Sequence, residues 1–215
     1  MLKTAPKIPM APMWPELPAP PGPGPGPAAC WPVPSEEQCA RWWDDFAMPE
    51  HIRAHSQKVA LVAGFLAEAG QRRGLSACLD TVVASALLHD LAKAYCIDHG
   101  GNHSQLGGAW AMALTGNPLL AQGVMHHVYW PFAVDLRRFF VPLAVLYGDK
   151  RVSHDRIVPI AERFGDLQDR YGKTPEIRDR IHTTNRQAKA IEDALSRLLE
   201  IDLNAHDFDR GRLVE

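Results

Sequence analysis

The chain has 215 residues, with 23 basic and 25 acidic side chains and four cysteines. This near balance gives no overall positive field of the kind that displaces counterions from duplexes, so we expect no duplex nucleic acid as partner. No two of the cysteines form a Cys-x-x-Cys pair, which argues against a zinc ribbon or a disulfide scaffold and favours a reducing compartment.

Apolar runs are short throughout the sequence. The longest, at 82–88 and 139–147, fall well below the length needed to cross a bilayer. Lys3 near the start is not followed by the continuous apolar stretch of a secretory signal. We therefore expect a cytoplasmic protein with no membrane partner.

Proline divides the chain before any motif is considered, because 12 of the 18 prolines lie in the first 34 residues. The Pro-Gly repeat at 21–27 fixes φ, removes backbone donors and offers no apolar face, so it cannot build a helix or an inner strand. We predict an extended arm or linker at 1–34 and one folded domain at 35–215. The arm should be dispensable, so a chain starting near Ser35 should keep any metal.

Beyond the arm, apolar residues recur with helical spacing and the helix signals agree with it. Ser35 and Gln38 resemble a capping box, Gly74 and Gly116 are typical helix ends, and Pro142 opens or kinks a helix. The expected helices are Ser35 to Phe46, Pro49 to Arg73, Ser76 to Leu91, His103 to Leu114, Asn117 to His127, a helix carrying Asp149 to Arg151, Arg156 to Tyr171, and Thr174 to Glu200.

The glycines and polar residues at 95–102 predict a loop between two of these helices. No alternating strand pattern of useful length occurs anywhere in the sequence. The predicted fold is therefore an all-α helical bundle in a single domain.

Four polar residues lie beside apolar helical segments: His55, His89, Asp90 and Asp149. Burying such groups is costly unless each is paired or bound to a metal. A helical bundle can direct ligands from facing helices to one point, and at a helix end two adjacent residues can both reach the same ion. Each residue alone has a simpler interpretation, since His55 can be a hydrogen-bonded core residue.

The sequence resembles the HD-domain superfamily of metal-dependent phosphohydrolases over about residues 47–165. The matching segments are His55-Ser-x-x-Val59-Ala60, Leu87-Leu88-His89-Asp90-Leu91-Ala92-Lys93, His103, His126-His127 and Gly148-Asp149-Lys150-Arg151. The resemblance implies a mostly helical fold and a divalent metal held by His55, His89, Asp90 and Asp149.

Some HD subfamilies hold two metals, and there the aspartate of the His-Asp pair bridges them. By this resemblance the extra ligands are His103 and one of His126 and His127; we favour His126, because His127 leads into the aromatic segment 129–132. His103 can alternatively cap its helix. The chain is also similar to the HD enzymes that split symmetrical dinucleoside tetraphosphates, but differs from them in its glycine-rich and aromatic loops.

A set of imidazoles and carboxylates without thiolates suits Mn, Fe, Co, Ni or Zn, and suits Mg less. One or two ions are consistent with it. Lys93 lies four residues after His89 and three after Asp90, on the same helical face, where it can hold a phosphate oxygen or serve as a solvated helix-end cation. Lys150 and Arg151 are further candidates for phosphate contact.

We therefore expect a metal-dependent phosphohydrolase that acts on a phosphate ester or anhydride of a small molecule such as a nucleotide, with Asp90 and Lys93 in catalysis. Alternatives are a metal- and nucleotide-binding sensory module with little turnover, and an oxygenase with a di-iron site.

Trp130 and Phe132 can form a base-stacking wall or simply fill the core. We expect the remaining histidines on the surface: His51, His99, His154, His182 and His206.

Overall fold

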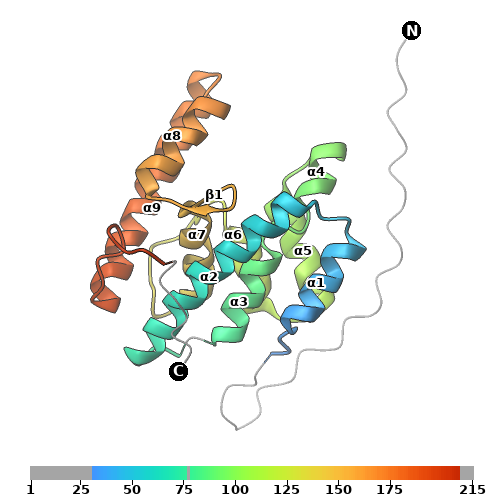
Figure 1. The fold of residues 1–215 in the computed structure, drawn as a ribbon, viewed down its shortest axis with the longest axis horizontal. Coiled ribbons are helices and arrows are strands. Elements are labelled where there is room, and N and C mark those ends of the chain that lie inside the picture. Colours follow the sequence, from blue (N-terminus) through green and yellow to red (C-terminus); the bar gives the residue numbers. More distant parts are fainter. Residues whose placement is uncertain (1–30, 77, 209–215) are drawn as a thin grey trace. The chain divides into compact units, whose positions relative to one another are not determined.

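The computed structural model describes residues 31–76 and 78–208, so most of the predicted arm at 1–34 lies outside the described residues. Within them the structure is mostly helical, with one small two-stranded sheet, which is consistent with the all-α prediction (Figure 1). The elements are α1 (Glu36–Asp45), α2 (Glu50–Arg72), α3 (Leu79–Leu88), α4 (Lys93–His99), α5 (His103–Thr115), α6 (Pro118–His126), α7 (Phe140–Lys150), β1 (Val152–Ser153), β2 (Arg156–Ile157), α8 (Ile160–Tyr171) and α9 (Pro175–Leu199).

Helix α2 lies at the centre of the packing and contacts α3, α7 and α9. Its apolar stripe, which includes Val59, Val62 and Leu66, is fully buried. Helices α5 and α6 pack against each other, and α6 continues the layer onto α3 and α7. The buried stripes of α2, α3 and α7 therefore form the main core, and the residues on their inner ends meet there.

Several predicted helix ends are confirmed. The Ser35 hydroxyl accepts a hydrogen bond from the Gln38 amide at 3.2 Å at the start of α1. Asn117 and Thr174 cap α6 and α9 in the same way. Gly116 ends α5 with a φ of 62°, in the left-handed region that glycine adopts without strain. These local signals fix where the helices begin and end.

Residues 95–102 contain a short helix where the sequence predicted a loop. After a turn at 89–92 the chain rewinds, and the Cys96 amide donates to the Ala92 carbonyl at 3.0 Å. Helix α4 ends only at Gly100 and Gly101, which both have positive φ. The predicted loop therefore begins about five residues too early, because the glycines mark the end of a helix and not its absence.

Two further helix starts differ from prediction. Cys78, not Ser76, precedes α3, and it makes no side-chain cap. The helix expected from Arg156 begins instead at Ile160, because residues 152–157 form an antiparallel hairpin with two residues in each strand. Its turn contains His154 with a φ of 58°. A hairpin this short leaves no alternating pattern in the sequence.

None of the helices in the described part of the chain combines the length and the apolar character that crossing a bilayer requires.

Candidate metal centre

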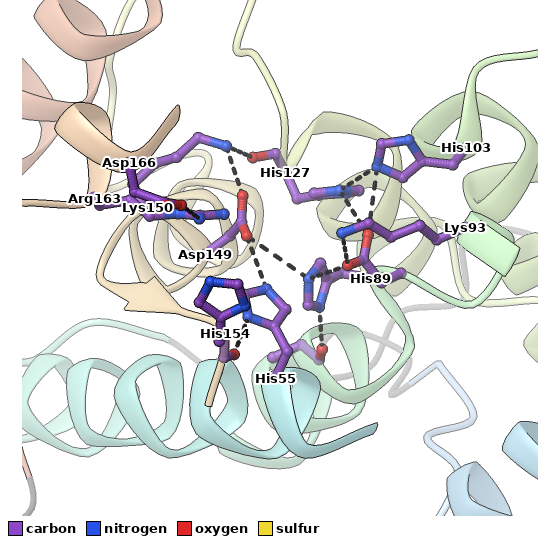
Figure 2. A network of polar contacts seen from close by, with 12 residues as sticks. His55, His89, Lys93, His103, His127, Asp149, Lys150, His154, Arg163 and Asp166 are labelled. Atoms are coloured by element: carbon purple, nitrogen blue, oxygen red, sulfur yellow. Dashed lines mark hydrogen bonds and ion pairs between the residues drawn. The ribbon is translucent and has the colours of Figure 1, made fainter. Parts of the chain in front are cut away.

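A buried cluster of histidines and aspartates lies where the inner ends of several helices meet (Figure 2). His55 comes from α2 and Asp149 from α7, while His89 follows the last turn of α3. The His55 Nε2 atom lies 3.1 Å from Asp149 Oδ1, and His89 Nε2 lies 3.9 Å from the same oxygen. These three atoms form one compact set of potential metal ligands.

A second set shares His89 and adds Asp90 and His127. Asp90 Oδ2 lies 3.5 Å from His89 Nε2, and Asp90 Oδ1 lies 3.5 Å from His127 Nε2. His103 Nε2 is 3.4 Å from Asp90 Oδ1 and 3.2 Å from His127 Nε2. The two oxygens of Asp90 therefore face different imidazoles, one on the side of His89 and one on the side of His103 and His127.

Three of these imidazoles are held in one tautomer by the backbone. His55, His89 and His127 each pair Nδ1 with a main-chain carbonyl, so Nδ1 carries the proton and donates it. The acceptors are the carbonyls of His154, Ala86 and Val124, at 2.8, 2.7 and 2.7 Å respectively. Each Nε2 is then a lone-pair donor turned toward the cluster, as in histidines that bind metals.

Two buried polar atoms of the cluster have no hydrogen-bond partner among the described residues: Nε2 of His89 and Oδ1 of Asp90. Leaving such a group unsatisfied costs about 1–3 kcal/mol. Both atoms are electron-pair donors, and each could be satisfied by a cation held in its own ligand set. The cluster therefore fits a metal ion in position and in donor chemistry.

The electrostatics keep the ligands in the protonation states that metal binding needs. Burial lowers the pKa of His89 to about 3 and that of His103 to about 4, so both rings are neutral at pH 7. Burial opposes ionisation of Asp90, but the adjacent Lys93 ammonium helps to hold its pKa well below the usual value. Burial likewise opposes ionisation of Asp149, and the Lys150 ammonium lowers its pKa.

Each carboxylate also contacts one lysine. Lys93 Nζ lies 2.7 Å from Asp90 Oδ2, and its side chain is 39% exposed. Lys150 Nζ lies 2.6 Å from Asp149 Oδ2 and also donates to the His127 carbonyl at 3.3 Å, but its side chain is only 7% exposed. Lys93 can therefore reach a bound ligand from the surface, whereas Lys150 supports the cluster from inside.

The structure brings His127, not His126, to Asp90. His127 follows α6 as its C-cap and is buried, whereas the His126 ring packs edge-on against Trp130 and Phe132. Adjacent helical residues diverge by about 100°, so only one of the two can face the cluster. The signal for His127 is present in the sequence, because it continues the buried stripe of Leu120 and Val124 at helical spacing.

Arg151, a candidate for phosphate contact, is committed to the fold. Its buried guanidinium donates to the Tyr147 hydroxyl at 2.6 Å and also bonds the Leu203 carbonyl. The Tyr147 hydroxyl in turn donates to Glu192 at 2.8 Å. This network ties the end of α7 to α9 and to the segment that follows it, two residues from Asp149.

The structure also places the two aromatic residues and the remaining histidines that the sequence singled out. Trp130 is fully buried and donates from Nε1 to the Ala133 carbonyl, so it fills the core, while Phe132 is 57% exposed. Of the remaining histidines, most are exposed as expected; His206 is half-buried against Phe65 and Phe208. Sequence reasoning missed the role of His154, whose carbonyl orients His55.

Comparisons of this chain with models of protein families, with curated proteins and with solved structures gave no match. The cluster itself contains two buried sets that can hold a metal ion: His55, His89 and Asp149, and His89, Asp90 and His127.

Proposed function

We propose that this protein is a metal-dependent phosphohydrolase of the HD-domain type, which hydrolyses a phosphate ester or anhydride of a small molecule such as a nucleotide. The observation that carries the proposal is the placement of Asp90. Its two oxygens face two groups of imidazoles, and its Oδ1 has no hydrogen-bond partner within the described chain. This arrangement, together with the order of the motifs, supports a bridging carboxylate between two ion positions.

In this proposal His55, His89, Asp90 and Asp149 hold the first ion, and Asp90, His103 and His127 hold the second. Imidazoles outnumber carboxylates in the set, which favours Mn, Fe, Co, Ni or Zn over Mg. A bound ion supplies an activated water and screens the charge of the phosphoryl group. Only neutral imidazoles can serve, and burial keeps His89 and His103 in that form by lowering their pKa.

The chain's own residues then position the substrate. Lys93 is the partly exposed cation at the cluster, and its pairing with Asp90 places the ammonium next to the ligands. Burial would lower the pKa of Lys93, but Asp90 raises it, so the ammonium stays charged and can hold a phosphate oxygen. The nucleotide part of the proposal depends on the resemblance of the motifs alone.

The test is Asp90→Asn, which keeps the shape of the side chain but removes its charge. We expect the variant to lose bound metal and to lose hydrolysis of a general phosphate ester by at least about 100-fold, since metal assistance is worth several kcal/mol. Elemental analysis of protein purified without chelator and a phosphate-release assay measure both effects. The exposed Asp98 of α4 gives the matched control, Asp98→Asn, with no change expected.

Retained hydrolysis in Asp90→Asn, at the level of the control, would sink the proposal. The sensory alternative has its own signature: the Mn²⁺-loaded protein would release no phosphate from a nucleotide panel, and yet one nucleotide would raise its melting temperature.

A further inference from the structure

A cavity separate from the metal centre lies between α9 and the segment 134–137, which precedes α7. Its volume is about 530 Å³, within the range of sites that hold small molecules. The wall from α9 consists of Ala194, Arg197 and Leu198. The last two lie three and four residues after the first, so all three share one face of the helix. Among the described residues that line the cavity, none is a proposed metal ligand.

Both walls are held in place by hydrogen bonds. Gln187 of α9 bonds the main chain of Trp130 twice: its Oε1 accepts from the amide at 2.9 Å, and its Nε2 donates to the carbonyl at 2.6 Å. Asp135 Oδ1 accepts from the amides of Arg137 and Arg138, both at 3.1 Å, and so fixes the turn that forms the second wall. The cavity is therefore formed before any ligand binds.

Two arginines line the cavity, Arg137 from the turn and Arg197 from α9. Both are exposed, and neither guanidinium has a hydrogen-bond or ion-pair partner among the described residues. The acidic residue of the lining, Asp135, already bonds two main-chain amides. The lining therefore carries two positive charges against one negative charge, and both guanidinium groups have donors free for an anion.

The rest of the lining is apolar. Leu136 is buried, Leu198 packs against the core, and Val134 is exposed. A simple inorganic anion would leave this apolar surface in water, and a cation would be repelled by the guanidinium groups. The lining therefore fits a ligand that has an apolar part beside an anionic group.

We propose that this cavity binds an organic anion in which a carboxylate or phosphate group is joined to an apolar chain or ring. Arg137 and Arg197 hold the anionic group, and Val134 and Leu198 contact the apolar part. Guanidinium groups suit both kinds of anion, because each presents planar pairs of donors to two oxygens. The site goes beyond the proposed function, since it lies outside the metal centre and needs no metal.

Calorimetric titration of the full chain with octanoate and with octyl phosphate tests the site. Binding of either anion supports the proposal, and the tighter of the two identifies the preferred anionic group. Arg137→Gln and Arg197→Gln should each weaken binding of that anion by roughly 3- to 10-fold, the range for a partly exposed charge-assisted contact. Arg137→Lys, which keeps the charge but loses the planar donors, should fall between Arg137→Gln and wild type. Octylamine, with the same chain and the opposite charge, should not bind.

The matched control is Arg180→Gln, because Arg180 is an exposed arginine of the same helix that does not line the cavity. This variant should bind the anion like wild type, and all variants should melt like wild type without ligand, so a lost contact is not confused with a lost fold. The inference is overturned if wild type binds neither anion, if octylamine binds as tightly as octanoate, or if the Arg137 and Arg197 variants bind like the control. Failure of the proposed function looks different: a chain that hydrolyses no phosphate ester would still bind the anion through both arginines.

Discussion

At the scale of single residues, the cluster is ordered by contacts that come from outside it. Three backbone carbonyls hold Nδ1 of His55, His89 and His127 at 2.7–2.8 Å, so the rings cannot rotate freely. Outer contacts of this kind fix the tautomer and the direction of a metal-binding histidine. The backbone therefore determines the direction of the Nε2 atoms before any ion binds.

The sequence left His126 and His127 as alternative ligands, and one substitution at each position distinguishes them. His127→Gln removes an Nε2 that lies 3.5 Å from Asp90 Oδ1, and we expect it to weaken Mn²⁺ binding by more than the roughly 10- to 100-fold typical of an outer-shell partner. His126→Gln is the natural control, because its ring packs on Trp130 and should not affect the metal. Calorimetric Mn²⁺ titration measures both. Equal losses in the two variants would contradict the geometry.

Much of the candidate site could be predicted at the residue scale. His55, His89, Asp90 and Asp149 were predicted from their places beside apolar helical segments together with the order of the motifs, and the structure brings all four together. His127 was named as the alternative to His126 but was not favoured, because its sequence neighbours, and not its position on the α6 stripe, guided the choice.

At the scale of elements, the distance between α2 and α7 determines the geometry of the first ligand set. Gly148 is the point of close approach: a Cβ there would lie 3.1 Å from the Val59 carbonyl oxygen and 3.2 Å from Val59 Cγ1. The contact is with helix backbone, which cannot yield as a flexible side chain would. The absence of a side chain next to Asp149 is therefore what allows it to approach His55.

Gly148→Ala should therefore destabilise the protein by about 1–3 kcal/mol, the usual cost of overpacking a core, and should weaken Mn²⁺ binding by widening the His55 to Asp149 distance. Gly165 of α8 provides the control, since a Cβ there meets nothing within 4 Å. Gly165→Ala should stabilise by about 0.5–1 kcal/mol through helix propensity, with metal binding unchanged. Urea unfolding and Mn²⁺ titration test the pair; a Gly148→Ala variant as stable as wild type would refute the argument.

The elements themselves could be predicted best where a cap or a glycine marks their ends, as at Ser35, Gly116 and Asn117. The failures lie where tertiary contacts decide. Helix α4 is too short for a clear period, and the hairpin of β1 and β2 has only two residues a strand. That hairpin is functionally placed, because the carbonyl of His154 in its turn holds His55.

At the scale of the whole molecule, the described fold begins before the predicted boundary at Ser35. The Pro32 carbonyl accepts a hydrogen bond at 3.1 Å from the side-chain amide of Asn117, which is fully buried and caps α6. Val33 packs against the core. The compact unit that contains the cluster starts at Trp31. Pro32 therefore belongs to the arm by composition but contacts the domain through Asn117.

Two shortened chains distinguish these boundaries. A chain starting at Ser35 loses the Pro32 acceptor and leaves the Asn117 amide unsatisfied, which should cost about 1–3 kcal/mol. For a domain of this size that lowers the melting temperature by roughly 2–4 °C per kcal/mol. A chain starting at Trp31 should melt with the full chain. Both should bind Mn²⁺ as the full chain does, because every proposed ligand lies between His55 and Asp149. Loss of Mn²⁺ from a folded chain that starts at Trp31 would instead show that residues 1–30 contribute to the centre.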